Sequence, residues 1–333
     1  MGKRNALLAA ALAALAIAGS VSANDSIAEM AAGGLVLRQS RDIDMLSEDL
    51  YVSPSRIRVR YVFRNRSPRD IRTIVAFPMP DRNLAELQES DRAFPTGFRT
   101  AVEGRPVRTQ VERRATLRGV DHSALLRQLG IPLAADGNAS ATIMTHLDRL
   151  PAAQQQRLLR MGLIEATEFD DTGRGMRRHW LPRWTAHETW YWEQTFPAGR
   201  DLNVEHSYVP GTGMSVSTGL HLPDYRRSAE GRRMIAEHCV DREFLASVDR
   251  LARARPAGEA MLPELRVGYI LRTGANWRSP IASFRLVVDK EAPDNIVSFC
   301  GTGLRRISPT QFEMRRTNWR PERDLSVLIV RPR

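Results

Sequence analysis

The chain has 333 residues and a formal net charge of +11, with 49 lysine and arginine residues against 38 aspartate and glutamate residues. Lys3 and Lys290 are the only lysines, so arginine, which suits rigid recognition of carboxylate and phosphate groups, carries nearly all of the positive charge. The basic residues are spread along the chain, which argues against a nucleic-acid partner. A compositional bias of the genome is the simpler explanation of the arginine content, and the charge leaves an acidic polymer or another protein as partner.

The first 23 residues have the pattern of an export signal. Lys3 and Arg4 precede an apolar run at residues 6–18, and Val21-Ser22-Ala23 is a small-x-small cleavage site. The run has about 13 residues, fewer than the roughly 20 that span a bilayer, so an uncleaved anchor is the less favoured alternative. We expect cleavage after Ala23, a periplasmic location, and no transmembrane segment after signal cleavage.

Residues 24–115 are predicted to form an N-terminal β-sandwich-like half. Residues 57–65 alternate apolar and arginine side chains with a period of two, as a half-buried strand requires. Asn65-Arg66-Ser67-Pro68 has turn chemistry, and residues 71–77 resume the alternation, so we expect these two strands to form an antiparallel pair. Glu103-Gly104 between two further alternating runs predicts a hairpin.

Residues 116–184 are predicted to be a helical and loop segment that bridges the two halves. Asp121 can cap a short helix that carries Leu125 and Leu129 on one face. A second helix is expected around residues 143–150, and Pro151 suits the first turn of a third. The polar residues 169–178 are predicted to form a loop.

Residues 185–333 are predicted to be a C-terminal β-sandwich-like half with a helical insertion at residues 228–254, in which Asp241 starts a new helix. The predicted strands are residues 189–196, 202–208, 265–272, 284–289, 297–300, 312–317 and 325–330. The fold class is therefore mainly β, with two β-sandwich-like halves, a short helical segment between them and a helical insertion in the second.

Cys239 and Cys300 are the only cysteines. In an exported chain, two cysteines favour a disulfide over a metal pair or a nucleophile. A bridge that closes a loop of about 60 residues would stabilise the fold by roughly 4 kcal/mol in the chain-entropy model. We expect this disulfide to hold the helical insertion in place.

Several motifs resemble an exported bacterial family that is catalogued only as domain-of-unknown-function family 4424. They are Asn24-Asp25-Ser26 through Gly34-Leu35, Ser47-Glu48-Asp49-Leu50, Val75-Ala76-Phe77-Pro78-Met79-Pro80-Asp81, Trp192-Glu193-Gln194-Thr195-Phe196-Pro197-Ala198-Gly199, and residues 284–290, 298–301 and 307–310. The resemblance covers essentially the whole mature chain. It implies a periplasmic, mainly β protein, and it brings no established activity and no catalytic residues.

A second resemblance covers only the first half of the chain. Phe63-Arg64-Asn65-Arg66-Ser67, Phe77-Pro78-Met79-Pro80 and Val102-Glu103-Gly104-Arg105 are similar to the VIT module, a β-domain found beside von Willebrand type A domains. The metal-binding A domain is absent here, so the adhesion chemistry of such proteins does not transfer.

Trp180, Trp184, Trp190 and Trp192 lie within 13 residues of sequence, and together with His206 they form the candidate binding surface. Tryptophan offers a large face and an N–H donor, so this cluster suits a platform for glycan rings. Core packing is the favoured interpretation, because Trp190 and Trp192 share one face of a predicted strand.

The histidines give no standard metal pattern. His179, His187 and Glu188 match neither the HExxH helix nor a zinc finger, so we expect neither a metal nor a cofactor. His206 lies in an alternating strand, where a hydrogen-bonded core histidine is favoured over a general base. No serine lies in a G-x-S-x-G motif.

The sequence therefore favours a non-catalytic envelope protein that binds or scaffolds a protein or an acidic polymer. The alternative is a hydrolase of envelope glycans or peptides that uses the Trp180–Trp192 region as its substrate platform. That alternative needs a pair of carboxylates beside the cluster, for which Glu188 and Glu193 near His206 are the candidates.

Overall fold

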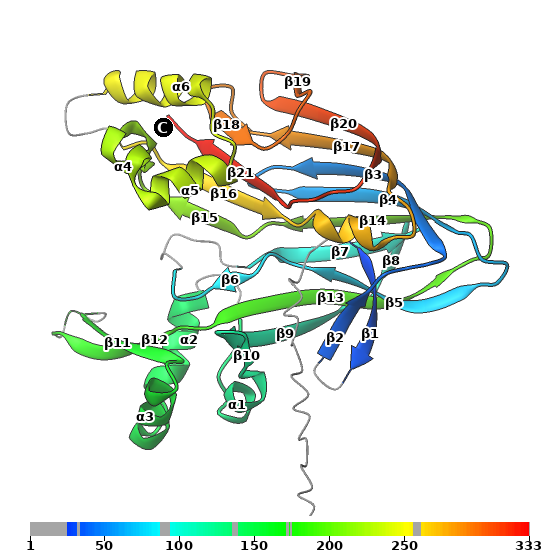
Figure 1. The fold of residues 1–333 in the computed structure, drawn as a ribbon. Coiled ribbons are helices and arrows are strands. Elements are labelled where there is room, and N and C mark those ends of the chain that lie inside the picture. The colour runs from blue at the N-terminus through cyan, green and yellow to red at the C-terminus, as the bar shows by residue number, and fades with distance from the viewer. Residues whose placement is uncertain are drawn as a thin grey trace, which may run out of the picture.

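The computed structural model describes residues 25–31, 34–86, 94–134, 139–170, 173, 175–255 and 261–332. The expected signal peptide at residues 1–23 and its cleavage site lie outside the described residues. Within the part of the chain that is described, no helix is long and apolar enough to cross a membrane. The prediction of a mainly β protein is confirmed (Figure 1).

Eight strands form one layer, which we call the large sheet. In spatial order they are β19 (Arg305–Arg306), β20 (Gln311–Trp319), β17 (Ile281–Asp289), β3 (Ile43–Val52), β4 (Ile57–Asn65), β14 (Asp201–Val209), β7 (Thr96–Val102) and β8 (Arg105–Val107). All neighbours are antiparallel except β17 and β3, which are parallel. The predicted hairpin at Glu103-Gly104 is confirmed, because it joins β7 to β8.

Two further sheets cover the inner face of the large sheet. The seven-stranded sheet contains β10 (Val120–Asp121), β9 (Gln110–Leu117), β13 (Thr185–Phe196), β5 (Ile71–Pro78), β1 (Ser26–Ala31) and β2 (Gly34–Arg38), with β6 (Arg82–Asn83) paired to β13. The four-stranded sheet contains β15 (Thr212–Ser215), β16 (Glu264–Tyr269), β21 (Leu325–Val330) and β18 (Ile296–Phe299). Strands from residues 24–115 and 185–333 hydrogen-bond to one another in the first two sheets, so these boundaries mark segments of the chain rather than separate sheets.

The predicted antiparallel pair at residues 57–77 is wrong. β4 and β5 form as strands, but β4 pairs with β3 and β14 in the large sheet, whereas β5 pairs with β1 and β13 in the opposite layer. Asn65 explains the crossing, because its Nδ2 donates to Arg69 O at 2.8 Å and to Phe196 O at 2.9 Å. The turn therefore carries the chain from one layer to the other. Period-two alternation shows that one face of a strand is buried. It does not show whether the next strand along the chain is a hydrogen-bonded neighbour or lies in the opposite layer.

The main core fills the space where the three sheets meet. It includes Tyr61 and Phe63 of β4, Phe77 of β5, Trp192 of β13 and Tyr269 of β16, all at most 2 % exposed. The rings of Phe63 and Trp277 lie 4.5 Å apart between their centroids. Because aromatic side chains bury large apolar areas, this cluster dominates the contact between the layers.

The bridging segment contains α1 (Ser123–Gln128), α2 (Ala139–Asp148) and α3 (Ala152–Arg160), as predicted in outline, and a hairpin of β11 (Ile164–Phe169) and β12 (Arg177–Pro182) that was not predicted. Asp121 lies one residue before the capping position, and its carboxylate accepts the N–H of Ser123 at 2.7 Å. The segment has a separate apolar core. It lies on the opposite side of the molecule from α4 to α6 (Figure 1).

The helical insertion is confirmed as α5 (Ala229–Glu237) and α6 (Arg242–Arg253), and α4 (Pro223–Arg227) lies before its predicted start. These helices pack on the four-stranded sheet. The short helices η1 (Gly219–His221) and η2 (Arg272–Asn276) complete the fold. Asp241 caps α6 by accepting the N–H of Phe244 at 2.7 Å. The predicted disulfide between Cys239 and Cys300 is also confirmed, and it ties the end of α5 to the end of β18.

Candidate functional site

The structure buries three of the four clustered tryptophans. Trp180 and Trp184 belong to the core of the bridging segment, where Trp184 Nε1 donates to Leu133 O at 3.0 Å. Trp192 is 2 % exposed and packs edge-on against the ring of His206. The burial of these rings favours the packing interpretation over a glycan platform.

Trp190 is half-buried, and both its ring and its indole N–H already contact other side chains. Its ring stacks on Phe98 at a centroid distance of 4.9 Å, and its Nε1 donates to Glu188 Oε1 at 2.9 Å. Glu188 also accepts from Arg113 at 2.9 Å, and the carboxylate of Glu193 pairs with an arginine of β5. The two carboxylates that a glycosidase would need are therefore held in ion pairs.

The remaining predicted histidines lie apart from one another. His179 Nδ1 bonds Asp148 at 2.7 Å in the bridging segment, and His187 Nδ1 bonds Asp81 at 2.6 Å at the end of β5. Among the described residues, no group of three or more histidine, cysteine, aspartate or glutamate side chains has the arrangement of a metal site.

His206 lies at the junction of the three sheets and is fully buried. Its Nε2 lies 3.1 Å from Asp25 Oδ1, and its Nδ1 lies 2.9 Å from Thr100 Oγ1. Burial raises the pKa of Asp25, and the nearby His206 partly offsets this effect. The hydroxyls of Tyr61 and Tyr269 meet at 2.9 Å in the same core. This cluster is closed from solvent, and its hydrogen bonds connect the three sheets.

The strongest candidate for ligand binding is a cleft of about 760 Å³ beside the disulfide. Its floor is apolar, with Leu286, Met314 and Leu325 among the residues that line it. Three arginines also line it, and we call the site the arginine cleft: Arg316, Arg320 and Arg323. Arg316 belongs to β20, and the other two lie in the connection from β20 to β21.

The three guanidinium groups donate only to neutral acceptors. Arg316 Nη2 donates to the carbonyl and the hydroxyl of Thr302, both at 2.6 Å. Arg320 Nη1 donates to Ala275 O at 3.0 Å, and Arg323 Nη1 lies 3.5 Å from Cys239 Sγ. Within the described residues no carboxylate pairs with any of them. Glu322 and Asp324 also line the cleft, and Asp324 pairs with Arg272 at 2.9 Å. A guanidinium has five N–H donors, so the three arginines keep unused donors.

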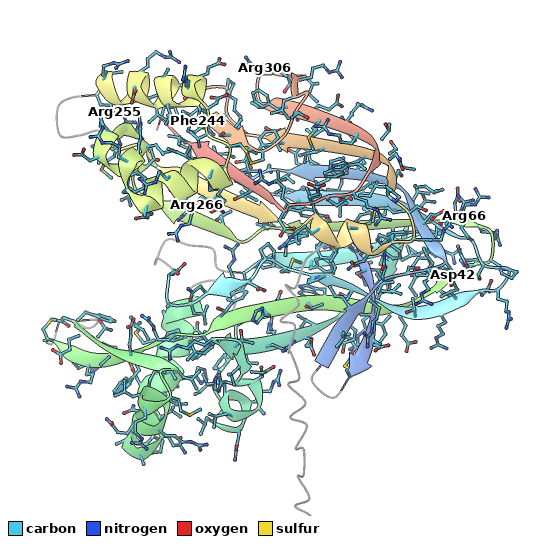
Figure 2. All side chains as sticks on the ribbon, in the orientation of Figure 1. Asp42, Arg66, Phe244, Arg255, Arg266 and Arg306 are labelled. Atoms are coloured by element: carbon cyan, nitrogen blue, oxygen red, sulfur yellow. A yellow bond between two sulfur atoms is a disulfide. The ribbon has the colours of Figure 1, made fainter. Side chains whose placement is uncertain are left out.

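The disulfide is the wall between this cleft and a second one of about 580 Å³, because Cys239 and Gly301 line both. Phe244 and Arg306, both marked in Figure 2, line the second cleft. Its lysine, Lys290, donates to Pro293 O at 2.6 Å, and burial lowers the pKa of Lys290. The second cleft therefore offers less free charge to a ligand.

Our sequence reasoning missed the arginine cleft. The basic residues are spread along the chain as a whole, but Arg315, Arg316, Arg320 and Arg323 lie within nine residues of sequence. This local density at the end of a predicted strand was the available signal. The acceptors Thr302 and Ala275 come from distant segments of the chain, so no local sequence pattern indicated their contacts with these arginines.

The chain matches one family model, described as "Domain of unknown function (DUF4424)", over residues 23–328. No curated protein matches it. A solved structure from Legionella pneumophila, of a "putative nutrient binding protein", matches with a TM-score of 0.45 and 14 % identity, covering 92 % of this chain and 70 % of that one. A match at this level carries no argument about function.

Proposed function

The chain belongs to the DUF4424 family, whose description names no activity, and from the geometry of this chain we propose non-catalytic binding of an anionic group in the arginine cleft. The group is a carboxylate or a phosphate carried by an acidic polymer or a protein of the cell envelope. Arginine recognises both groups through paired N–H donors.

One observation carries this proposal: three guanidinium groups without a carboxylate partner among the described residues line one cleft with an apolar floor. Several other surface arginines pair with a carboxylate, as Arg60 does with Glu205 at 2.7 Å. The apolar floor suits the carbon skeleton of a ligand, and the arginines suit its charged end.

The proposed location is the periplasm. A disulfide in a chain of this kind supports an oxidising compartment, and the expected signal peptide at residues 1–23 agrees with it. An acidic envelope polymer or a protein would be available to the cleft there.

Binding can be tested with two labelled probes, an oligoglutamate peptide and a polyphosphate chain, by fluorescence anisotropy. The test variant is Arg316→Gln with Arg320→Gln and Arg323→Gln. We expect a loss of affinity of at least about tenfold, because three exposed charge-assisted contacts of about 0.5–1 kcal/mol each sum to about 1.5–3 kcal/mol. The probe that binds more tightly distinguishes carboxylate from phosphate.

The matched control exchanges three exposed arginines of the β7–β8 hairpin region, at the far edge of the large sheet: Arg99, Arg105 and Arg108. This variant has the same change in net charge, so it should keep wild-type affinity within about twofold at 0.15 M salt. Equal losses in both variants would show that net charge alone attracts the probes. Absence of binding to either probe by the wild type would refute the proposal.

A further inference from the structure

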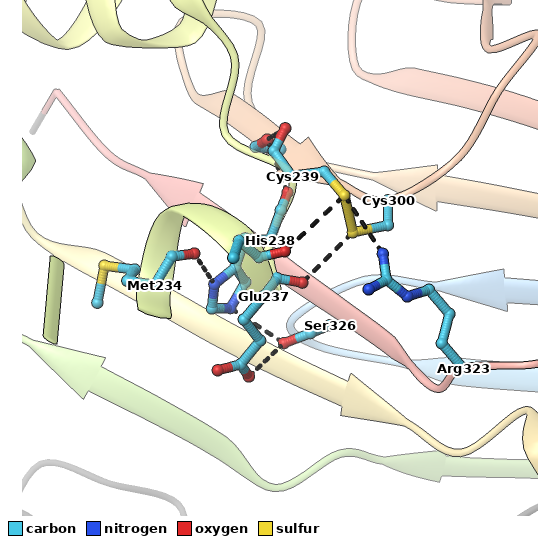
Figure 3. Close-up of a disulfide and its surroundings, with 9 residues drawn as sticks. Met234, Glu237, His238, Cys239, Cys300, Arg323 and Ser326 are labelled. Carbon is cyan, nitrogen blue, oxygen red and sulfur yellow. Dashed lines mark hydrogen bonds between the residues drawn. A yellow bond between two sulfur atoms is a disulfide. The ribbon is translucent and has the colours of Figure 1, made fainter. Parts of the chain in front are cut away.

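A serine, a histidine and a glutamate meet on the other side of the disulfide from Arg323 (Figure 3). Ser326 of β21 has its Oγ 3.0 Å from His238 Nε2 and 3.1 Å from Glu237 Oε1. The two partners lie at the end of α5 and are 88 and 89 residues away in sequence. Neither the candidate tryptophans nor the arginine cleft contains these side chains.

The protonation of His238 follows from its second contact. Its Nδ1 lies 3.0 Å from Met234 O, and a carbonyl oxygen only accepts, so Nδ1 carries the proton. The lone pair of Nε2 then points to the hydroxyl of Ser326. Burial lowers the pKa of His238, an effect that Glu237 and Glu264 oppose and Arg266 reinforces. The imidazole is therefore a neutral base near neutral pH.

Ser326 lines an open groove of about 290 Å³. Gly268 lies directly opposite Ser326 on the neighbouring strand β16, so no side chain from that position covers the hydroxyl. A Cβ added at Gly268 would meet Pro80 Cγ at 3.6 Å. The groove thus lies between the four-stranded sheet and the segment that follows β5.

Arg266 lines the same groove, its side chain is 36 % exposed, and it is marked in Figure 2. Its Nε is buried and has no hydrogen-bond partner among the described residues. The nearest carboxylate oxygen, Glu264 Oε1, lies 3.8 Å away, which is too long for a hydrogen bond. A guanidinium that lines the groove suits an oxygen on which negative charge develops, or the carboxylate of a substrate.

We propose that Ser326 is a nucleophile with His238 as its general base, and that the groove cleaves a small ester or amide that carries a carboxylate. Ser326 Oγ forms a bond to the carbonyl carbon of the substrate while its proton passes to His238 Nε2. The bond to the leaving group then breaks, and the proton of His238 Nε2 goes to that group. Water repeats the sequence on the acyl-serine, which releases the carboxylic acid and restores both residues.

The other two contacts have supporting roles. Met234 O is a positioning group, since it fixes the tautomer and the orientation of the imidazole. The hydroxyl of Ser326 has one hydrogen, which it can donate to Glu237 Oε1 or to His238 Nε2. When His238 is protonated only Glu237 can accept it, so the serine becomes reactive only as His238 loses its proton. This site shares no arginine with the proposed binding cleft, and the failure of either proposal leaves the other intact.

A fluorophosphonate probe tests the nucleophile on the full exported chain with its disulfide intact. The serine displaces fluoride and forms a phosphonate ester, which intact-mass and peptide mass spectrometry detect. We expect one adduct per chain at Ser326, and its absence in Ser326→Ala. The control Ser207→Ala removes a strand serine of β14, in the large sheet, and should label as the wild type does.

Two further measurements separate the proposed chemistry from a structural role. The labelling rate of the wild type should rise with pH as His238 loses its proton, and His238→Asn should lower the rate at least about 100-fold. Glu237→Gln should keep the rate within about threefold. No adduct at Ser326 in the wild type, or a pH-independent rate, overturns the proposal even where the histidine variant fails to fold.

Discussion

Glu313→Gln should destabilise the protein and loosen one wall of the arginine cleft. The side chain of Glu313 is only 4 % exposed, and its two oxygens accept from three arginines. Oε1 accepts from Arg285 Nε at 2.8 Å and from Arg315 Nη2 at 2.9 Å, and Oε2 accepts from Arg305 Nη2 at 2.7 Å. Arg305 belongs to β19, which follows the loop that holds Thr302.

The size of the effect follows from these contacts. In glutamine the remaining carbonyl keeps two of the hydrogen bonds without the charge, which costs about 1 kcal/mol in total at exposed arginines. The new amide donor faces Arg305 Nη2, so two donors oppose each other at a cost of about 2 kcal/mol. We therefore expect a loss of about 3 kcal/mol, which in a chain of this size corresponds to a decrease in Tm of about 6 °C.

The loss should depend on pH with a defined sign. Three arginines hold the pKa of Glu313 at about 2, below its ordinary value of 4.5. A lowered carboxyl pKa gives stability that is complete above about pH 4.5 and disappears as the pH falls toward 2. The difference in stability between the wild type and Glu313→Gln should therefore shrink in this window. Asp44, whose pKa is also lowered to about 2, cancels in this difference because both proteins contain it.

Thermal unfolding followed by circular dichroism at pH 7 and pH 3 measures both effects. Glu205→Gln is the matched control, because its partner Arg60 is 2.7 Å away but the carboxylate is 41 % exposed. The control should lose less than about 1 kcal/mol. A Glu313→Gln protein that melts within about 1 °C of the wild type at pH 7 would refute the reasoning, as would a difference that is equal at both pH values.

Removing the disulfide with Cys239→Ala and Cys300→Ala should lower the free energy of unfolding by roughly 4 kcal/mol in urea titrations without reductant; an unchanged midpoint would show that the bridge adds no stability. Asp25→Ala should cost about 2–3 kcal/mol because it leaves His206 Nε2 without its partner, whereas Asp25→Asn keeps an acceptor and should cost less than about 1 kcal/mol. Since burial raises the pKa of Asp25, the wild type should also lose stability as pH rises from about 4 through the folded pKa, and Asp25→Asn should not. Equal costs for the two substitutions would contradict this account of the buried cluster.

The strands could be predicted from sequence more readily than their partners. The alternation at residues 57–65 gave the bounds of β4 and its buried face, because Ile57, Val59, Tyr61 and Phe63 are all at most 1 % exposed. It gave no partner, because the same pattern results from burial against any second layer. The parallel pairing of β3 with β17 joins residues more than 230 positions apart, and no local pattern reports such a contact.

The candidate sites also differ in how much of each could be predicted from the sequence. The disulfide could be predicted because two cysteines leave only one possible intramolecular pair. The tryptophan cluster could be noticed, but not its burial, which depends on the core of the bridging segment around Leu133 and Trp184. The arginine cleft needs the loop that carries Thr302 to lie beside β20. That arrangement depends on Glu313 and its arginines, whose pairing spans the three strands β17, β20 and β19.

The two proposed sites share a wall, and neighbouring residues of the chain face opposite sides of it. Cys239 and Leu325 line the arginine cleft. His238, which precedes Cys239, and Ser326, which follows Leu325, form the pair at the groove. A strand alternates its faces, so Leu325 and Ser326 could not both belong to one site. The disulfide fixes the end of α5 from which both His238 and Cys239 project. Its loss should therefore disturb both sites together, whereas exchange of the cleft arginines should affect only one.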